Sequence, residues 1–161
     1  MAAVEVKILF GANIIILNLK YNTTYQEERN MRILIAEDDF ASRKFMLKFL
    51  SKFGECDITV DGMEAVDAYL MALDDGTPYD LVCLDIMMPA LDGYQALKAI
   101  RDIEQERKIP EDNRAKIIMT TALNEGANVN KAFDLGCVAY AGKPIDQVKF
   151  ESVLRKLELI P

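Results

Sequence analysis

The chain has 161 residues, 51% of them hydrophobic, which is enough for one well-packed domain and too few for two full ones. Its 26 Asp and Glu against 19 Lys and Arg give a formal charge of −7. This acidity argues against direct binding of nucleic acid, which normally requires a basic patch. The sequence contains no histidine, which excludes histidine general bases and histidine-ligated metals. Any chemistry must therefore use carboxylates, hydroxyls, lysine or a hard metal ion.

Three cysteines, Cys56, Cys83 and Cys137, are far apart in the sequence and form no CxxC motif. This spacing excludes a zinc knuckle and a thioredoxin-type redox site. Each lies in or beside an apolar run, where a small buried thiol is the usual role. Three free thiols fit a reducing compartment, so we expect a cytoplasmic protein.

The first thirty residues differ from the rest, because they are neutral and the whole charge of −7 falls on residues 31–161. Their apolar run, residues 8–19, is well short of the ~20 residues that cross a bilayer, so we expect no membrane insertion. No cleavage motif of a secretory signal follows it. We expect residues 1–30 to be an extension of unknown role. It is either an extra strand, a helix packed on a neighbour, or sequence upstream of a natural start at Met31.

From Met31 onward, short β-rich runs alternate with amphipathic helical stretches. The predicted strands are residues 32–36, 56–60, 80–84, 116–120 and 138–141. Apolar residues at helical spacing follow each strand: Met46, Phe49, Leu50 and Phe53; Val66, Tyr69, Leu70 and Leu73; Ala96, Ile100 and Ile103; Val129, Ala132 and Phe133; Phe150, Val153, Leu154 and Leu157. Gly54 and Gly136 are predicted helix stops.

Five strand–helix units in strict alternation predict an α/β fold, a doubly wound parallel sheet with helices on both faces. Such sheets bind ligands beyond the carboxyl ends of their strands. The residues at those ends are Glu37, Asp38 and Asp39 after the first strand, Asp85 after the third, Thr120 and Thr121 after the fourth, and Lys143 after the fifth. The topology therefore predicts one site built from residues a hundred positions apart.

The chemistry of this set points to phosphoryl transfer. Crowded carboxylates with no His or Cys suit Mg²⁺, and Lys143 suits a phosphoryl oxygen. Thr121 offers a hydroxyl, and Asp85 can act as a nucleophile that forms an aspartyl-phosphate. Structural roles compete for single residues, since Asp39 and Thr121 are also candidate helix caps. Pro144 either ends the last strand or follows a cis peptide bond.

Four segments together resemble the response-regulator receiver domains of two-component signalling: residues 33–39, 85–93, 119–122 and 140–144. The resemblance extends from Met31 to about Leu157 and implies a flavodoxin-like sheet of order 2-1-3-4-5 with five helices. It also implies Asp85 as the phosphoacceptor, Lys143 as the phosphate-contacting lysine and Mg²⁺ as the cofactor.

The resemblance assigns the remaining site residues with two alternatives left open. Arg43 lies five residues after Asp38, a spacing typical of the family's metal-binding acid. Asp38 is therefore expected to bind the metal directly and Glu37 mainly through water, while a register of Asp38 with Asp39 is the alternative. Met87 is expected to offer its backbone carbonyl to the metal.

Thr121 resembles the switch hydroxyl and Tyr140 the switch aromatic, although Tyr140 is also compatible with ordinary packing. The resemblance implies a phosphorylation-activated signalling switch rather than an enzyme, which accepts its phosphoryl group from a sensor histidine kinase or a phosphotransfer protein. The surface from the fourth to the fifth helix would then change its affinity for a downstream protein of unknown identity. Since nothing long follows the fifth helix, we expect a stand-alone receiver, as in chemotaxis signalling.

Two other functions fit parts of the pattern. A Mg²⁺-dependent phosphohydrolase with an aspartyl nucleophile generally has a second acid two residues after it, and position 87 is Met. A receiver-like interaction module that is never phosphorylated commonly lacks the aspartate or the lysine, and Asp85 and Lys143 are both present. Met87 and Leu123 offer no polar side chain to guide an attacking water, which predicts slow loss of the phosphoryl group.

Overall fold

The computed structural model describes residues 5–10, 13–18, 30–122 and 128–161. Its N-terminal part contains β1 (Glu5–Phe10) and β2 (Asn13–Asn18), which pair antiparallel with each other and form a sheet of their own. The described part of the apolar run at residues 8–19 thus belongs to two strands, instead of the single strand or helix expected.

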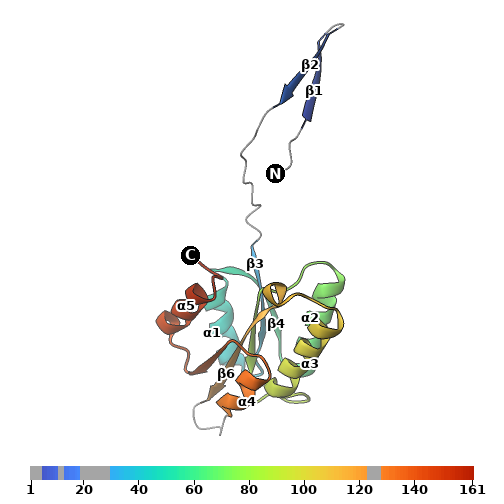
Figure 1. The fold of residues 1–161 in the computed structure, drawn as a ribbon. Coiled ribbons are helices and arrows are strands. Elements are labelled where there is room, and N and C mark those ends of the chain that lie inside the picture. The colour runs from blue at the N-terminus through green and yellow to red at the C-terminus, as the bar shows by residue number, and fades with distance from the viewer. Residues whose placement is uncertain (1–4, 11–12, 19–29, 123–127) are drawn as a thin grey trace.

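The rest of the described chain alternates between strands and helices, as predicted. The strands are β3 (Met31–Ala36), β4 (Gly54–Thr59), β5 (Leu81–Asp85), β6 (Lys116–Ala122) and β7 (Ala139–Lys143). The helices are α1 (Phe40–Leu50), α2 (Gly62–Asp74), α3 (Gly93–Glu106), α4 (Val129–Asp134) and α5 (Gln147–Lys156), with a short 3-10 helix at Glu111–Asn113. All five strands are parallel, in the order β4-β3-β5-β6-β7 (Figure 1). This order confirms the predicted 2-1-3-4-5 sheet.

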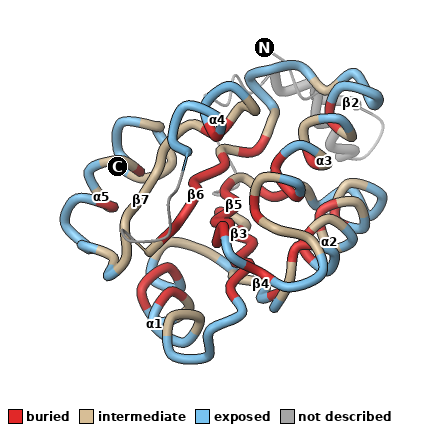
Figure 2. Tube along the Cα trace, turned by 90° about the horizontal axis from the view of Figure 1, so that it is seen from below, coloured by how far each residue is buried: buried red, intermediate tan, exposed pale blue. Residues whose placement is uncertain are grey.

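Helices cover both faces of the sheet, because successive strand residues point to opposite faces and both sets are apolar. On β3, Ile33 joins a buried cluster with α1 and α5, whereas Leu34 joins the cluster with α2, α3 and α4. Figure 2 shows β3, β5 and β6 as a buried central layer between the less buried edge strands β4 and β7, with α1 and α5 on one side and the other three helices opposite. Each large side chain buried in these clusters stabilises the fold by roughly 1.5 to 3 kcal/mol.

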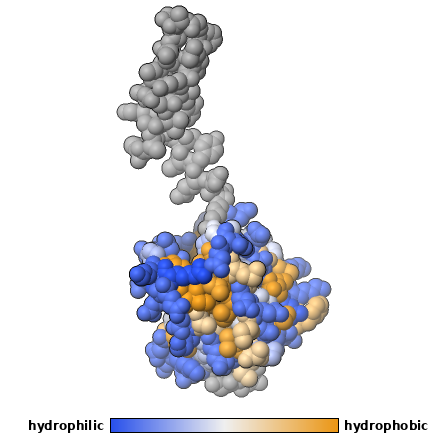
Figure 3. All heavy atoms as spheres, turned by 90° about the vertical axis from the view of Figure 1, so that its right-hand side faces the viewer, coloured by the Kyte–Doolittle hydropathy of each residue, from blue (hydrophilic) through white to orange (hydrophobic). Residues whose placement is uncertain are grey.

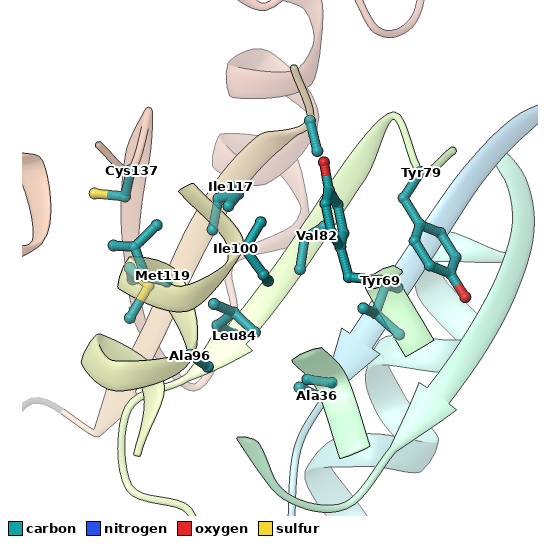
Figure 4. Close-up of a cluster of buried hydrophobic side chains, with 14 of the residues drawn as sticks. Ala36, Tyr69, Tyr79, Val82, Leu84, Ala96, Ile100, Ile117, Met119 and Cys137 are labelled. Atoms are coloured by element: carbon teal, nitrogen blue, oxygen red, sulfur yellow. The ribbon is translucent and has the colours of Figure 1, made fainter. Parts of the chain in front are cut away.

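The cluster beneath α2 and α3 is the larger of the two (Figure 4). It places Tyr69 of α2 and Tyr79, which precedes β5, in a stacked arrangement with ring centroids 6.3 Å apart. Their hydroxyl groups point in opposite directions and donate to different acids, Tyr69 to Glu104 and Tyr79 to Asp57. Buried tyrosine hydroxyls normally find such partners, so these two aromatic rings pack without an unsatisfied polar group.

Every α-helix begins directly after an Asp or Asn whose side chain accepts a hydrogen bond from a backbone N–H of the first turn. These N-cap residues are Asp39, Asp61, Asp92, Asn128 and Asp146. Such caps satisfy donors that have no partner within the helix, which explains where the helices start. Asp39 is therefore a cap, as one interpretation of the sequence proposed. Asn128 caps α4, so the suggestion that Thr121 caps this helix is wrong.

Several strands are displaced from their predicted bounds. Gly54 does not stop a helix: α1 ends at Leu50, and Gly54 begins β4. A Cβ at Gly54 would lie 2.0 Å from the carbonyl oxygen of Met31, so close backbone contact between strands requires glycine there. Strands β6 and β7 extend two residues further than predicted, to Ala122 and Lys143. The site residues at these ends are consequently held within the sheet rather than in loops.

The side of the domain formed by α2 and α3 exposes apolar residues. Figure 3 shows hydrophobic residues gathered on this side and surrounded by hydrophilic ones. Met63 and Met71 of α2 are 52% and 63% exposed, so they belong to the surface and not to the core. None of the described helices is long and apolar enough to cross a membrane.

Candidate functional site

The carboxyl ends of four adjacent strands bring the predicted site residues together. Glu37 directly follows β3, Asp85 is the last residue of β5, and Lys143 is the last residue of β7. Alternate residues of a strand point to the same face of the sheet. Ile35, Cys83 and Ala141, which lie two positions before these three residues, pack in the cluster with α1 and α5, so the three site residues point to that face. Thr120 of β6 lies in register with Asp85. One face of one sheet edge therefore carries two acids, a hydroxyl and a lysine.

Lys143 joins the two buried acids. Its Nζ atom lies 2.5 Å from Glu37 Oε2 and 3.0 Å from Asp85 Oδ1, and all three side chains are largely buried. The other Glu37 oxygen accepts a hydrogen bond of 3.1 Å from the backbone N–H of Asp39. Asp85 Oδ1 is buried and accepts no hydrogen bond within the described part of the chain, so its partner is the charge of Lys143 alone.

This arrangement changes the protonation of both charged groups. Burial, followed by the charge of Glu37, raises the pKa of Asp85 to about 7, against the opposing effect of Lys143. Burial alone would lower the pKa of Lys143, but the close carboxylates of Glu37 and Asp85 outweigh this effect and raise that pKa. The Asp85 carboxylate is therefore less stable than an ordinary one, and an additional cation would stabilise it.

The acidic residues form a cluster that fits a cation. Glu37, Asp38 and Asp85 each offer one oxygen, and these oxygens lie within 4.8 Å of one another. Ligands on opposite sides of Mg²⁺ are about 4.2 Å apart, since each Mg–O bond is about 2.1 Å long. Asp38 is exposed, and its carboxylate makes no hydrogen bond or ion pair in the described part of the chain. The donor set, all oxygen with one free carboxylate, is of the kind that Mg²⁺ prefers.

The loop after β5 supports this cluster through close backbone packing. A Cβ at Gly93 would lie 2.3 Å from the carbonyl oxygen of Asp85, and a Cβ at Gly62 would lie 2.0 Å from that of Leu91. The starts of α3 and α2 thus approach the loop more closely than any other residue type permits. The side chain of Met87 in this loop is 56% exposed and apolar.

The two predicted switch residues lie on the opposite face of the sheet. Thr121 is buried, and its hydroxyl donates 3.2 Å to the carbonyl of Ala122. Tyr140 of β7 packs at the edge of the cluster beneath α2, α3 and α4. Its hydroxyl oxygen is buried with no hydrogen-bond partner among the described residues, and burial raises its pKa. The structure therefore places both residues beside the site edge, but it gives neither a hydrogen bond to Asp85.

The sequence alone did not reveal a second polar network, at the other end of the sheet. Glu104 is fully buried and accepts hydrogen bonds from Tyr69 Oη at 2.6 Å and from the backbone N–H of Ala115 at 3.1 Å. Arg101 forms an ion pair of 2.7 Å with it and also donates to the carbonyl of Gly136. Tyr69 lies on α2, whereas Arg101 and Glu104 lie on α3, and only the tertiary fold shows that Glu104 contacts both other residues.

Leu123 also entered the sequence predictions, but it lies outside the described residues.

A doubly wound parallel sheet with an acidic cluster and a lysine at its carboxyl edge defines a class of protein, the phosphoacceptor domains of signalling. The family model for the response regulator receiver domain matches residues 33–155. The chain belongs to this family, and it is a receiver domain of two-component signalling.

Known proteins of this kind are similar over most of the chain. The chemotaxis protein CheY of Treponema pallidum is 34% identical over 120 residues, which cover 73% of this chain and 76% of that protein. The receiver domain of the Saccharomyces cerevisiae response regulator Ssk1, solved with the histidine phosphotransfer protein Ypd1, aligns with a TM-score of 0.66 and 26% identity. That alignment covers 80% of this chain and 88% of the other.

A Borrelia burgdorferi complex of CheX with CheY, BeF3 and magnesium aligns with a TM-score of 0.65 and 27% identity, and covers 79% of this chain and 89% of the other. Other relatives are longer. The chain spans 55% of a probable transcriptional regulator from Porphyra purpurea, and 12% of a probable histidine kinase from Oryza sativa.

Proposed function

We propose that residues 31–161 act as a phosphorylation-activated switch in which Asp85 is the phosphoacceptor. The observation that carries the proposal is the position of its carboxylate. It is 4% exposed, lies 3.0 Å from the Lys143 ammonium, and forms a cluster with the oxygens of Glu37 and Asp38. Few arrangements other than phosphoryl transfer use a nucleophilic carboxylate between a lysine and an acidic cation site. Residues 1–30 are a separate extension whose role is unassigned.

Transfer follows from this geometry. One oxygen of Asp85 attacks the phosphorus of a phosphohistidine, the P–O bond forms as the P–N bond breaks, and the histidine nitrogen keeps the electron pair. Lys143 holds a phosphoryl oxygen and compensates its charge. Glu37 and Asp38, together with Asp85 and the carbonyl of Met87, would hold Mg²⁺, which neutralises the negative charge that accumulates in the transition state.

This chain contains no histidine, so a phosphohistidine donor would lie outside it. We propose a sensor histidine kinase or a phosphotransfer protein as the donor. The similarity to a receiver domain that was crystallised with a phosphotransfer protein supports this choice. We also place the protein in the cytoplasm, since Cys56, Cys83 and Cys137 are all free thiols.

The signal would leave the site through Thr121 and Tyr140. The Thr121 hydroxyl donates only to its neighbouring carbonyl, and the Tyr140 hydroxyl has no partner in the described part of the chain, so little holds either in its present position. A phosphoryl group adds acceptor oxygens that Thr121 would turn toward, and Tyr140 would then repack. The surface formed by α4, β7 and α5 would change as a result. This surface already exposes apolar side chains, including Phe133 and Val148, to a downstream protein.

The test is incubation of the protein with acetyl phosphate and Mg²⁺, followed by intact mass measurement. We expect one phosphoryl adduct, absent in Asp85→Asn and absent when EDTA removes Mg²⁺. Asp92→Asn, which changes an aspartate seven residues away at the start of α3, is the matched control and should keep the adduct. Continuous release of phosphate without a trapped adduct would instead indicate a phosphohydrolase. No adduct at all would indicate an interaction module.

A further inference from the structure

Most polar groups of the loop between β3 and α1 have a hydrogen-bond or ion-pair partner. The carboxylate of Glu37 is bonded to Lys143 and to the backbone N–H of Asp39, and its own backbone N–H donates 3.1 Å to the carbonyl of Thr59. Asp39 caps α1 through Ser42. The exposed carboxylate of Asp38 makes no such bond. The direction of this side chain therefore depends on how firmly its backbone is held.

Arg43 holds that backbone. Its Nη1 atom donates to the carbonyl oxygen of Glu37 and to that of Asp38, both at 2.9 Å. These carbonyls belong to the two peptide groups on either side of the Asp38 Cα atom. One guanidinium nitrogen therefore fixes the orientation of the backbone on both sides of Asp38. Arginine can do this because its rigid planar donor group keeps its geometry once the side chain is placed.

Phe40 keeps the guanidinium group in place. The Arg43 Cζ atom lies 5.7 Å from the centroid of the Phe40 ring, within the range of a cation–π interaction. Phe40 is 69% exposed, so burial in the core does not explain its position. Both residues lie on the first turn of α1, and the Asp39 cap fixes the start of that helix. Arg43 and Phe40 therefore form a clamp on the Glu37 and Asp38 carbonyls, and this clamp lies on a rigid helix next to the acidic cluster.

We propose that Arg43 is a positioning residue for the cation site: by clamping the two carbonyls it directs the Asp38 carboxylate toward the oxygens of Glu37 and Asp85. The inference rests on the proposed function, since it assigns to Asp38 a role in binding Mg²⁺. It concerns a residue that touches neither the cation nor the phosphoryl group. Groups that orient metal ligands typically change metal affinity 10- to 100-fold when they are removed.

The charge of Arg43 makes the proposal testable by the sign of the effect. A positive charge beside the acidic cluster repels Mg²⁺, so if Arg43 acted only through its charge, its removal would tighten Mg²⁺ binding. A positioning role predicts the opposite result. Lys44 is the matched control, because it is the adjacent residue on α1, carries the same charge, and makes no hydrogen bond or ion pair in the described part of the chain.

The experiment measures Mg²⁺ binding to the full chain by isothermal titration calorimetry. We expect Arg43→Met to raise the dissociation constant at least tenfold, and Arg43→Lys, which keeps a donor without the planar group, to give a smaller increase. Lys44→Met should leave the constant unchanged or lower it. The rate of Asp85 phosphorylation by acetyl phosphate should fall in Arg43→Met at low Mg²⁺ and recover at saturating Mg²⁺, since the nucleophile and Lys143 are intact.

Each outcome decides one question. Unchanged or tighter Mg²⁺ binding by Arg43→Met, with wild-type binding intact, overturns the positioning role and leaves the proposed function standing. Loss of phosphorylation that saturating Mg²⁺ does not restore also overturns it. Wild-type protein that binds no Mg²⁺ overturns the proposed function and this inference with it. Urea unfolding verifies the fold of each variant. If Arg43→Met is unfolded, Arg43→Lys decides: an increased Mg²⁺ dissociation constant supports the positioning role, and an unchanged one overturns it.

Discussion

Lys143 Nζ lies 2.5 Å from Glu37 Oε2, nearer than the 3.0 Å that separates it from Asp85 Oδ1. The lysine is therefore anchored by an acid other than Asp85, the proposed phosphoacceptor. One ammonium group compensates two buried carboxylates, so the site has an excess of negative charge before any cation binds. This excess has consequences for stability as well as for chemistry, because the folded protein must hold these charges away from water.

Replacement of Asp85 by Asn should stabilise the cation-free protein at neutral and alkaline pH. The pKa of Asp85 is raised from 3.8 to about 7, so the stability associated with its protonated form is complete below pH 4 and is lost as the pH rises to 7. A shift of this size, which already includes the opposing effect of Lys143, corresponds to about 4 kcal/mol as an upper limit, and screening by solvent at the site lowers the expected gain to about 1 to 3 kcal/mol.

Urea unfolding in EDTA checks this prediction. The free energy of unfolding of Asp85→Asn should exceed that of wild type at pH 8, and the difference should shrink toward pH 4.5. Addition of Mg²⁺ should stabilise wild type and not the variant, since only wild type keeps the complete acidic cluster. A variant that is less stable than wild type at pH 8 in EDTA would show that the charge excess is absent.

Replacement of Gly93 by Ala should weaken both the fold and the site. A Cβ there would lie 2.3 Å from the Asp85 carbonyl oxygen and 2.8 Å from the Ile86 Cα, and neither backbone atom can move independently. We expect a loss of about 1 to 3 kcal/mol in the free energy of unfolding, and slower phosphorylation by acetyl phosphate. Gly76→Ala is the control: its φ of +71° makes alanine strained, but nothing lies within 4 Å and Asp85 is distant in sequence, so it should lose stability alone.

The sheet and its helices follow closely from the sequence, because apolar periodicity reports burial directly. The strand order came from the family resemblance. The errors lie at element ends. Glycine commonly ends helices, which predicts a helix stop at Gly54, but this residue permits the close approach of β4 to Met31. The polar side chains of Thr121 and Lys143 predict that β6 and β7 end before them, but their backbones still pair with the neighbouring strand.

The composition of the site edge was also predictable, since parallel strands bring their carboxyl ends together whatever the loops do. Its contacts were not. Lys143 lies nearer to Glu37 than to Asp85, and the spacing of these residues along the sequence does not determine these distances. The same holds for Arg43, which entered the sequence argument only as a marker of register and proves to bond the backbone of Glu37 and Asp38.

Phosphorylated protein should lose its phosphoryl group slowly, with a half-life well beyond seconds. Met87 lies two residues after Asp85, and its side chain is 56% exposed. Because this side chain is apolar, it cannot orient an attacking water. Met87→Asn supplies an amide at this position and should shorten the half-life several-fold, whereas Met87→Leu should leave it unchanged. The measurement is the decay of the intact-mass adduct in Mg²⁺ after acetyl phosphate is removed. Equal decay in the Asn and Leu variants would show that position 87 does not control access of water.

The network around Glu104 should make the protein sensitive to alkaline pH. Burial, followed by the hydrogen bond to Glu104, raises the pKa of Tyr69 well above its ordinary value of 10. A raised pKa means that this contribution to stability is complete below pH 10 and is lost as the pH rises further. Tyr69→Phe should cost about 1.5 to 3 kcal/mol at pH 8, because it removes a hydrogen bond to a buried charge.

Urea unfolding between pH 8 and pH 11 separates this contribution from that of other groups. The stability difference between wild type and Tyr69→Phe should be constant up to about pH 10 and narrow above it, since phenylalanine has no proton to lose. Tyr140→Phe is the matched control, because the Tyr140 hydroxyl has no partner in the described part of the chain and its removal leaves no acceptor unpaired. A Tyr69→Phe variant as stable as wild type at pH 8 would mean that Arg101 and Ala115 alone satisfy Glu104.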